Sequence, residues 1–130
     1  LEGHGFAAMQ VEGPGGPLWL VSLHLYWPWP HSQPADLAAL RPVLENLEGP
    51  IIAGGDFNMV PWSHTLGELG RASRTRHAGT VGPTFNLITP LLGLPIDHVL
   101  IPAEATLLSV ERRPLLGSDH RGVLATIALP

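Results

Sequence analysis

The chain has 130 residues, of which 45% are hydrophobic and only 14% are charged. Its length allows one modest core, and a charged fraction so far below the ~25% of typical soluble domains predicts that some apolar surface stays uncovered. The net charge of −4, with no lysine, argues against a broadly basic nucleic-acid-binding face, and the lack of cysteine excludes disulfides and thiolate catalysis.

The predicted elements begin with a hairpin. Residues 6–11 and 18–26 are typical of two strands joined by a Gly/Pro turn, and a helix is expected from residue 32 to residue 49. Pro42 lies inside that helix, and we expect it to kink the helix or split it. The later predicted elements are a buried strand from residue 51, a short helix at 63–69, a loop at 70–83, and strands at 96–101, 106–111 and 123–128.

The segment Trp27-Pro28-Trp29-Pro30, directly after the second strand, has the most unusual composition in the chain. Prolines restrict its backbone and the indoles offer large apolar faces, so this segment could form a rim that stacks on a base or inserts between lipid headgroups. The alternative is that it caps the core. The sequence leaves both interpretations open.

The apolar run that starts at Ile51 ends at Gly54-Gly55 and is followed by Asp56 and Asn58. If the chain stays extended there, these two polar side chains face the same side at the end of a buried strand. An Asp oxygen suits a hard cation such as Mg²⁺, and an Asn amide can bond a phosphate oxygen or orient a water. Simple turn formation is the alternative, because Gly, Asp and Asn all favour turns.

Two further acidic segments have the same design. Asp97 precedes the apolar residues 98–101, and Asp119 and His120 come shortly before the apolar stretch 123–129. Each acid therefore lies at the edge of a predicted strand, which favours a shared site. The seven histidines include no closely spaced pair of the kind that builds zinc sites, so Mg²⁺ is the favoured ion, with Mn²⁺ as an alternative.

In chain order, Gly55-Asp56-Phe57-Asn58, Ile96-Asp97-His98 and Ser118-Asp119-His120 resemble motifs of the endonuclease/exonuclease/phosphatase superfamily. Ser22-Leu23-His24-Leu25 resembles the strand that carries a further active-site histidine in many members, and Thr84-Phe85 resembles an element that lines the substrate cleft. The resemblance implies a metal-dependent phosphoesterase with an α/β fold, in which two sheets pack face to face with helices outside.

The resemblance also implies roles for these residues. Asp56 and Asn58 would position the nucleophilic water and the phosphate, with Asp56 as general base, and Asp119 and Asp56 would bind metal. His120 would contact the scissile phosphate with Asp97 as its partner. An acceptor on one imidazole nitrogen fixes the tautomer and favours the protonated ring, which can then stabilise charge on the phosphate.

The remaining expected site residues are His24, Thr84, Phe85, Trp27 and Arg74. His24 would place a second imidazole beside the phosphate, the alternative being a structural histidine inside the fold. Thr84, Phe85 and Trp27 would contact the substrate. Arg74 belongs to the basic part of the predicted loop at 70–83, which is either a clamp for a phosphate group or a solvated loop.

Two features of the family have no counterpart in the sequence. Well before the His24 strand, members carry an Asn near the end of the first strand and a Glu that is the principal magnesium ligand. Glu2 and Glu12 are the only acids upstream of His24 in this chain, and neither has that setting. We therefore expect residues 1–130 to be a single partial domain. It would be the carboxyl-terminal half of a four-layered α/β sandwich, with a mixed, mainly antiparallel sheet and flanking helices.

The predicted function is hydrolysis of a phosphodiester or phosphomonoester in the parent protein, with this chain inactive alone. Nucleic acid, phospholipid and inositol phosphate remain open as substrates, and a non-catalytic protein-interaction module is the alternative function. We expect the sheet face made for the missing half to drive formation of a two-fold homodimer, through apolar residues around 21–23, Ile52 and 99–101.

The Trp-Pro-Trp-Pro segment, together with Leu-Gly-Leu-Pro-Ile-Asp-His, is similar to bacterial members that carry amino-terminal membrane helices ahead of this domain. This similarity implies a membrane anchor in the missing amino-terminal part. The domain would then lie at or outside the inner membrane, in the periplasm.

Overall fold

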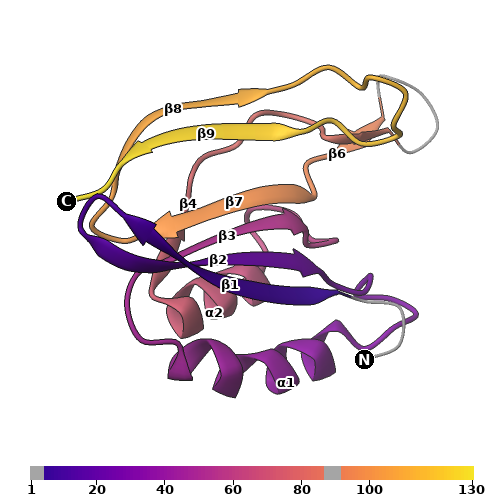
Figure 1. Cartoon of the computed structure of the whole chain (residues 1–130). Helices are drawn as coiled ribbons and strands as arrows, with labels where there is room; N and C mark the ends of the chain where they lie inside the picture. The colour runs from indigo at the N-terminus through magenta and orange to yellow at the C-terminus, as the bar shows by residue number, and fades with distance from the viewer. Residues whose placement is uncertain (1–4, 87–91) are drawn as a thin grey trace.

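The computed structural model describes residues 5–86 and 92–130, and its centre is a five-stranded sheet (Figure 1). In spatial order the strands are β1 (Phe6–Gly13), β2 (Gly16–His24), β3 (Ile51–Asp56), β7 (Asp97–Pro102) and β4 (Thr75–His77). β2 and β3 run parallel, and the other neighbouring pairs in this sheet are antiparallel. The carboxyl ends of β2 and β3 and the amino end of β7 therefore meet at one edge.

β1 and β2 form the predicted hairpin. Phe6 pairs with Leu23, and the register continues without a shift to Gly13 opposite Gly16. Gly16 has a φ of +110°, a conformation that glycine adopts without the steric cost of a Cβ, so the Gly/Pro composition of this segment encodes the tight turn.

α1 (Gln33–Asn46) covers one face of the sheet, where Leu37, Leu40 and Leu44 enter the main core. The helix is continuous across Pro42, so the expectation that this proline splits it is wrong. An interior proline costs about 3 kcal/mol, whereas burying two leucine side chains contributes about 3–6 kcal/mol. Leu40 and Leu44 are buried on either side of Pro42, so packing holds the helix together.

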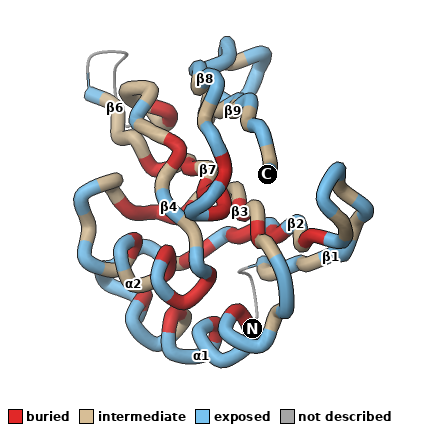
Figure 2. The backbone as a smooth tube through the Cα atoms, turned by 90° about the vertical axis from the view of Figure 1, so that its left-hand side faces the viewer, coloured by how far each residue is buried: buried red, intermediate tan, exposed pale blue. Residues whose placement is uncertain are grey.

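α2 (His64–Ser73) packs beside α1 on the same face (Figure 2). Its N-cap is Ser63, whose Oγ accepts a hydrogen bond from the backbone N–H three residues on, at 3.1 Å. Its buried stripe continues to Ala72, and the helix ends at Arg74, which has a left-handed φ of 55°. The helix is thus longer than predicted and β4 follows it directly, so the expectation of a loop is wrong for residues 70–77.

A second hairpin, formed by β8 (Thr106–Arg112) and β9 (Val123–Ala128), lies over the face of the sheet opposite the helices (Figures 1 and 2). Leu107 and Ile127 of this hairpin pack with Ile101 of β7 in a second, smaller core. The hairpin therefore covers the β7 side of this face.

Two short strands, β5 (Phe85–Asn86) and β6 (Gly93–Leu94), pair with each other near the turn of the second hairpin. We did not predict them, because two-residue strands carry no periodic pattern. The longer predicted strands are confirmed to within two residues at each end, and the mixed sheet with two flanking helices confirms the α/β fold class. In the described part of the chain, neither helix is long and apolar enough to span a bilayer.

On the face of the sheet opposite the helices, the β1–β2 side remains exposed to solvent in this chain. Met9 is 59% exposed and Leu20 is 38% exposed, and together with Ala7 and Ile52 they line a shallow apolar hollow. We call these four residues the open face. An uncovered apolar face is what the low charged fraction predicted.

The residues that form the open face differ in part from those expected. Val21 and Leu23 point to the other side of the sheet and are buried under the helices, because side chains alternate along a strand. Ile101 is buried beneath the second hairpin. The sequence pattern could not indicate which face each strand turns toward the helices.

We expect the chain to self-associate as a two-fold dimer through the open face, because pairing two copies removes apolar surface from water on both. Light scattering at micromolar concentration should show a dimer, and Met9→Asp should shift it toward the monomer by placing a charge in the contact. Leu108→Asp, at a leucine on β8 that is 62% exposed, is the matched control and should leave the dimer intact. A monomer mass for the unmodified chain would contradict this expectation.

Two histidines form a hydrogen-bonded chain in the interior. His98 Nε2 lies 2.7 Å from the carbonyl oxygen of Met59, and its Nδ1 lies 2.9 Å from His77 Nε2. The N–H of Gly79 donates to His77 Nδ1 at 3.2 Å. Since a carbonyl only accepts, His98 donates from Nε2. His77 Nδ1 accepts from Gly79, so His77 carries its proton on Nε2 and donates it to His98 Nδ1. Both rings are therefore neutral.

Burial, together with the neighbouring His98, lowers the pKa of His77 from 6.5 to about 4. The unfolded chain binds a proton at a higher pH than the folded chain does, so the free energy of unfolding should fall as the pH drops from about 6.5 toward about 4. Urea unfolding across this range measures the loss. His77→Gln cannot titrate at this position and should show a smaller loss than the unmodified chain; equal losses would contradict the account.

Candidate active site

The strand register places three polar side chains in one row. His24, the last residue of β2, pairs with Asp56, the last residue of β3, and Asp56 pairs with Asp97, the first residue of β7. Residues directly opposite one another point to the same face of a sheet. Because Val21 and Leu23 point to the helices, His24 points to the opposite face, and Asp56 and Asp97 lie beside it there.

Gly55 allows the strands to approach closely enough for this row to form. It has a φ of +145°, and a Cβ at this position would lie 1.9 Å from the carbonyl oxygen of Leu23 on the neighbouring strand. Any side chain would therefore push β2 and β3 apart immediately before His24 and Asp56. This contact explains why a glycine precedes the acid.

Asp56 lies at the centre of the site, and its two carboxylate oxygens have different surroundings. Oδ1 accepts a hydrogen bond from the backbone N–H of Asn58 at 2.9 Å. Oδ2 lies 3.7 Å from His24 Nε2 and 3.9 Å from His120 Nε2. Burial raises the pKa of Asp56, the hydrogen bond from Asn58 lowers it, and the negative charge of Asp97 raises it again. The nearby His120 and His24 lower it, and the net direction of the Asp56 pKa is upward.

The side chain of Asn58 holds the loop that follows β3. Asn58 is 4% exposed, and its Nδ2 donates to the carbonyl oxygen of Leu25 at 2.8 Å. Gln33 supports the same loop, with its Nε2 donating to the carbonyl oxygens of Tyr26 at 2.8 Å and Phe57 at 3.0 Å. Sequence analysis missed Gln33, because a glutamine at a helix start gives no signal of a distant partner.

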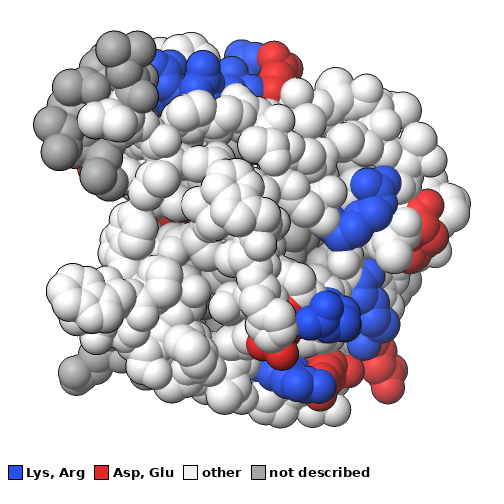
Figure 3. Space-filling view, turned by 180° about the vertical axis from the view of Figure 1, so that it is seen from behind, with Lys and Arg blue, Asp and Glu red and all other residues white. Residues whose placement is uncertain are grey.

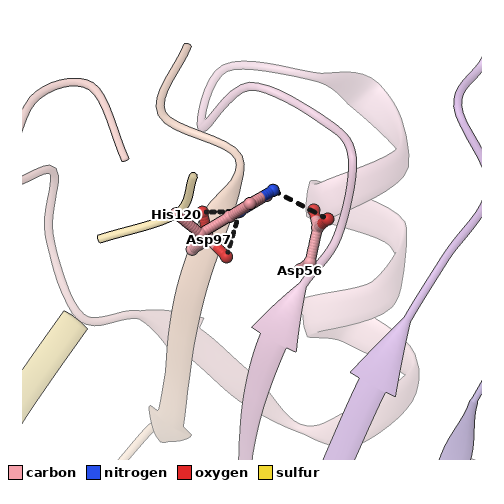
Figure 4. A group of neighbouring side chains, drawn as sticks. All are labelled: Asp56, Asp97 and His120. Atoms are coloured by element: carbon pink, nitrogen blue, oxygen red, sulfur yellow. Dashed lines mark hydrogen bonds and ion pairs between the residues drawn. The ribbon is translucent and has the colours of Figure 1, made fainter. Parts of the chain in front are cut away.

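His120 is fixed by Asp97. Its Nδ1 lies 2.9 Å from Asp97 Oδ2 and 3.1 Å from Oδ1, and its Nε2 faces Asp56 across the site (Figure 4). An ionised carboxylate only accepts, so Nδ1 carries the proton that is shared with Asp97. The predicted His120–Asp97 pair is therefore present in the structure.

Thr84 ties together the two segments that carry this pair. Its Oγ1 accepts from the N–H groups of Ile96 and Asp97, each at 3.1 Å, and lies 3.3 Å from the carbonyl oxygen of Leu94, to which it donates. The carbonyl oxygen of Thr84 accepts from the N–H of Arg121 at 2.7 Å. Thr84 is completely buried, so the expectation that it lines the substrate cleft is wrong; its hydroxyl is used inside the protein.

Aromatic side chains form one wall of the site. The ring of Phe85 lies 4.7 Å from that of His120, and Trp27 meets Phe85 edge-on at 6.3 Å. A backbone bridge between Phe85 and His120 holds the two residues together. Phe85 and Trp27 thus lie where a substrate beside His120 would meet them, and their contact with substrate remains a prediction.

Two expected site residues, Arg74 and Asp119, are not part of the cluster formed by Asp56, Asp97 and His120. Arg74 caps α2 and donates to the carbonyl oxygens of Glu45 and Leu47 near the start of β3, away from the edge that carries the site, so its assignment to the substrate is wrong. Asp119 is exposed and lies outside the group of possible metal ligands, because the backbone that turns His120 toward Asp97 leaves the preceding side chain in solvent.

Asp56, Asp97 and His120 form the group that could hold a metal ion, with one ligand atom from each within 4.8 Å of the others. Two carboxylates suit a hard cation. However, both oxygens of Asp97 contact His120, and Oδ1 of Asp56 is bonded to Asn58. The residues fit a divalent ion, but they offer it few oxygen atoms.

Comparison with solved structures shows the same fold. An endonuclease/exonuclease/phosphatase family protein from Leptotrichia buccalis has a TM-score of 0.75 and 13% identity, over 95% of this chain and 54% of its own. D. rerio TDP2 complexed with a single-strand DNA product has a TM-score of 0.69 and 20% identity, over 97% of this chain and 62% of its own.

The inositol polyphosphate 5-phosphatase domain of SPsynaptojanin, in complex with inositol (1,4)-bisphosphate and calcium ion, has a TM-score of 0.66 and 17% identity. That match covers 98% of this chain and 51% of the other. The chain thus spans roughly half to two thirds of the length of these three proteins. No curated protein sequence matches the chain.

A family comparison gives the remaining result. The description "Endonuclease/Exonuclease/phosphatase family" matches residues 3–120, which include the whole row of polar side chains and His120. The chain therefore belongs to the endonuclease/exonuclease/phosphatase family.

Proposed function

We propose that the protein hydrolyses phosphate esters by direct attack of water. The observation that carries the proposal is the position of Asp56 Oδ2 between two imidazole nitrogens, 3.7 Å from His24 Nε2 and 3.9 Å from His120 Nε2. A carboxylate that can take a proton, beside two potential cations, suits a reaction in which water loses a proton and a phosphate gains negative charge.

Each residue of the group has a distinct role in this proposal. Asp56 accepts the proton of the attacking water, which its raised pKa favours. Asp97 holds His120 through Nδ1, so His120 presents Nε2 to a phosphate oxygen, and His24 approaches the same phosphate from the other side. Asn58 holds the loop after β3 and so keeps Asp56 in place. No side chain forms a covalent intermediate.

A divalent ion, Mg²⁺ or in its place Mn²⁺, would be held by Asp56 and Asp97 and would neutralise charge on the phosphate. Oδ1 of Asp56 already accepts a hydrogen bond from Asn58, and both Asp97 oxygens already contact His120, so part of their accepting capacity is used within the protein. Mg²⁺ gives up its waters reluctantly, and the few oxygen atoms that Asp56 and Asp97 offer therefore form a weak site. We therefore propose that further ligands, a glutamate among them, come from an amino-terminal half of the domain in a longer protein.

The substrate classes that we propose are nucleic acid, phospholipid and inositol phosphate. DNA and inositol phosphate are bound by two of the structures that share this fold. A protein-interaction module is the second candidate function, and the exposed Met9 and Leu20 of the open face favour it. We also propose that the longer protein carries a membrane anchor before this domain and acts in the periplasm.

The test is turnover of nucleic acid, phospholipid and inositol phosphate substrates by the longer protein. Asp56→Asn and His120→Ala should each lower turnover about a hundredfold or more, because each removes a positioned proton acceptor or a stabilising cation. His64→Ala, at an exposed histidine on α2, should not change the rate. The 130-residue chain alone should be inactive and bind Mg²⁺ weakly by calorimetry.

Two results would contradict the proposal. Near-normal turnover by the His120 variant would remove His120 from the reaction. Robust Mg²⁺-dependent turnover by the 130-residue chain would show that the chain holds all the ligands it needs.

A further inference from the structure

Three large apolar side chains stand exposed around the candidate active site. Trp29 is 85% exposed, Trp62 is 77% exposed and Leu116 is 91% exposed. We call these three side chains the apolar rim. Each comes from a different loop: the loop after β2, the loop after β3, and the β8–β9 turn, which also leads to His120.

The three loops share one edge of the molecule. β2 and β3 are parallel, so the loops that follow them leave the sheet at the end where His24 and Asp56 lie. The β8–β9 turn reaches the same end (Figure 1). Trp27 is set apart from the rim, because it is only 36% exposed and its ring contacts Phe85 in the site wall.

The two loops that carry the tryptophans hold no formal charge, because residues 27–35 and 57–67 contain no Asp, Glu, Lys or Arg. In the β8–β9 turn, residues 114–118 around Leu116 are also uncharged, and Arg113, Asp119 and Arg121 lie on either side of them. In Figure 3 the charged atoms gather along the top and down the right-hand side of the view, and the described surface between them is largely uncharged. A surface that binds nucleic acid needs cations to neutralise phosphates, so the rim is poorly suited to that partner.

The arginines nearest the β8–β9 turn are mostly engaged within the protein. Arg112 donates to the carbonyl oxygen of Pro83 at 2.7 Å, and Arg113 lies 3.2 Å from Glu111. Arg121, next to His120, is partly buried. They therefore do not turn the rim into a basic groove.

The arrangement of the rim also distinguishes a bilayer from a protein partner. A stable protein interface needs a contiguous, closely packed patch, whereas the rim consists of single side chains on separate loops. A fluid bilayer surface can receive separate insertions, and indole rings favour its interfacial region. Pro28, Pro30 and Pro61 restrict the loops that carry the two tryptophans, so little conformational freedom is lost on insertion.

We propose that the apolar rim docks the protein on the surface of a phospholipid bilayer, with Asp56 and His120 facing the headgroups. The docking does not depend on catalysis. Only its consequence, that a headgroup phosphodiester is the substrate presented to the site, rests on the proposed function.

Flotation with phosphatidylcholine vesicles, whose headgroups carry no net charge, tests the proposal on the 130-residue chain. We expect the unmodified chain to float with the vesicles, with binding little affected by salt because it is not electrostatic. The double variant Trp29→Ala/Trp62→Ala should lose about tenfold or more in vesicle partitioning, since it removes two large apolar side chains. Circular dichroism should show that the fold is unchanged, because both side chains lie in solvent.

Met9→Ala is the matched control, because Met9 is an exposed apolar residue on the open face. It should partition like the unmodified chain; a loss equal to that of the double variant would place vesicle binding on the open face and overturn the proposal. Absence of vesicle binding by the unmodified chain would also overturn it. A third result would overturn the proposal: the chain binds a single-stranded oligonucleotide but not vesicles, and the double variant binds the oligonucleotide more weakly. The rim would then contact bases.

Discussion

The contact between β2 and β3 at Gly55 is the constraint on which the site depends. A Cβ at position 55 would lie 1.9 Å from the Leu23 carbonyl oxygen, so only glycine lets the parallel strands keep their register up to His24 and Asp56. That register, continued into β7, brings together three polar side chains that are far apart in the sequence. The leucines of α1 and α2 hold the other face of the same strands, so the main core fixes the geometry of the site.

A segment outside the five-stranded sheet completes the site. His120 precedes β9, and it meets Asp97 because Thr84 bonds to the backbone on both sides: its hydroxyl to the N–H of Asp97, and its carbonyl to the N–H of Arg121. The site therefore lies between the five-stranded sheet and the second hairpin. In the proposed reaction, this arrangement would hold the polar groups in place before substrate arrives, so no free energy would be lost in ordering them.

Sequence reasoning located the cluster of Asp56, Asp97 and His120 better than it located the residues around them. Asp56, Asp97 and His120 could be named because each lies beside an apolar run in a recognisable motif. Arg74 and Thr84 were misassigned, since only the three-dimensional structure shows that Arg74 caps a helix away from the site and that the Thr84 hydroxyl faces inward. Gln33 and the His77–His98 pair escaped notice because their partners are distant in sequence. Strand existence followed from apolar patterning, but the face on which Val21 and Leu23 pack depended on the helices.

The fold holds His120 with Nδ1 bonded to Asp97 and Nε2 directed at Asp56. NMR of the histidine ring nitrogens measures this directly. In the unmodified chain, Nδ1 of His120 should carry a proton that exchanges slowly, and Thr84→Val should speed its exchange by loosening Asp97, whereas Thr126→Val, at an exposed threonine on β9, should not. A neutral His120 ring protonated on Nε2 instead, or no difference between the two threonine variants, would contradict the account.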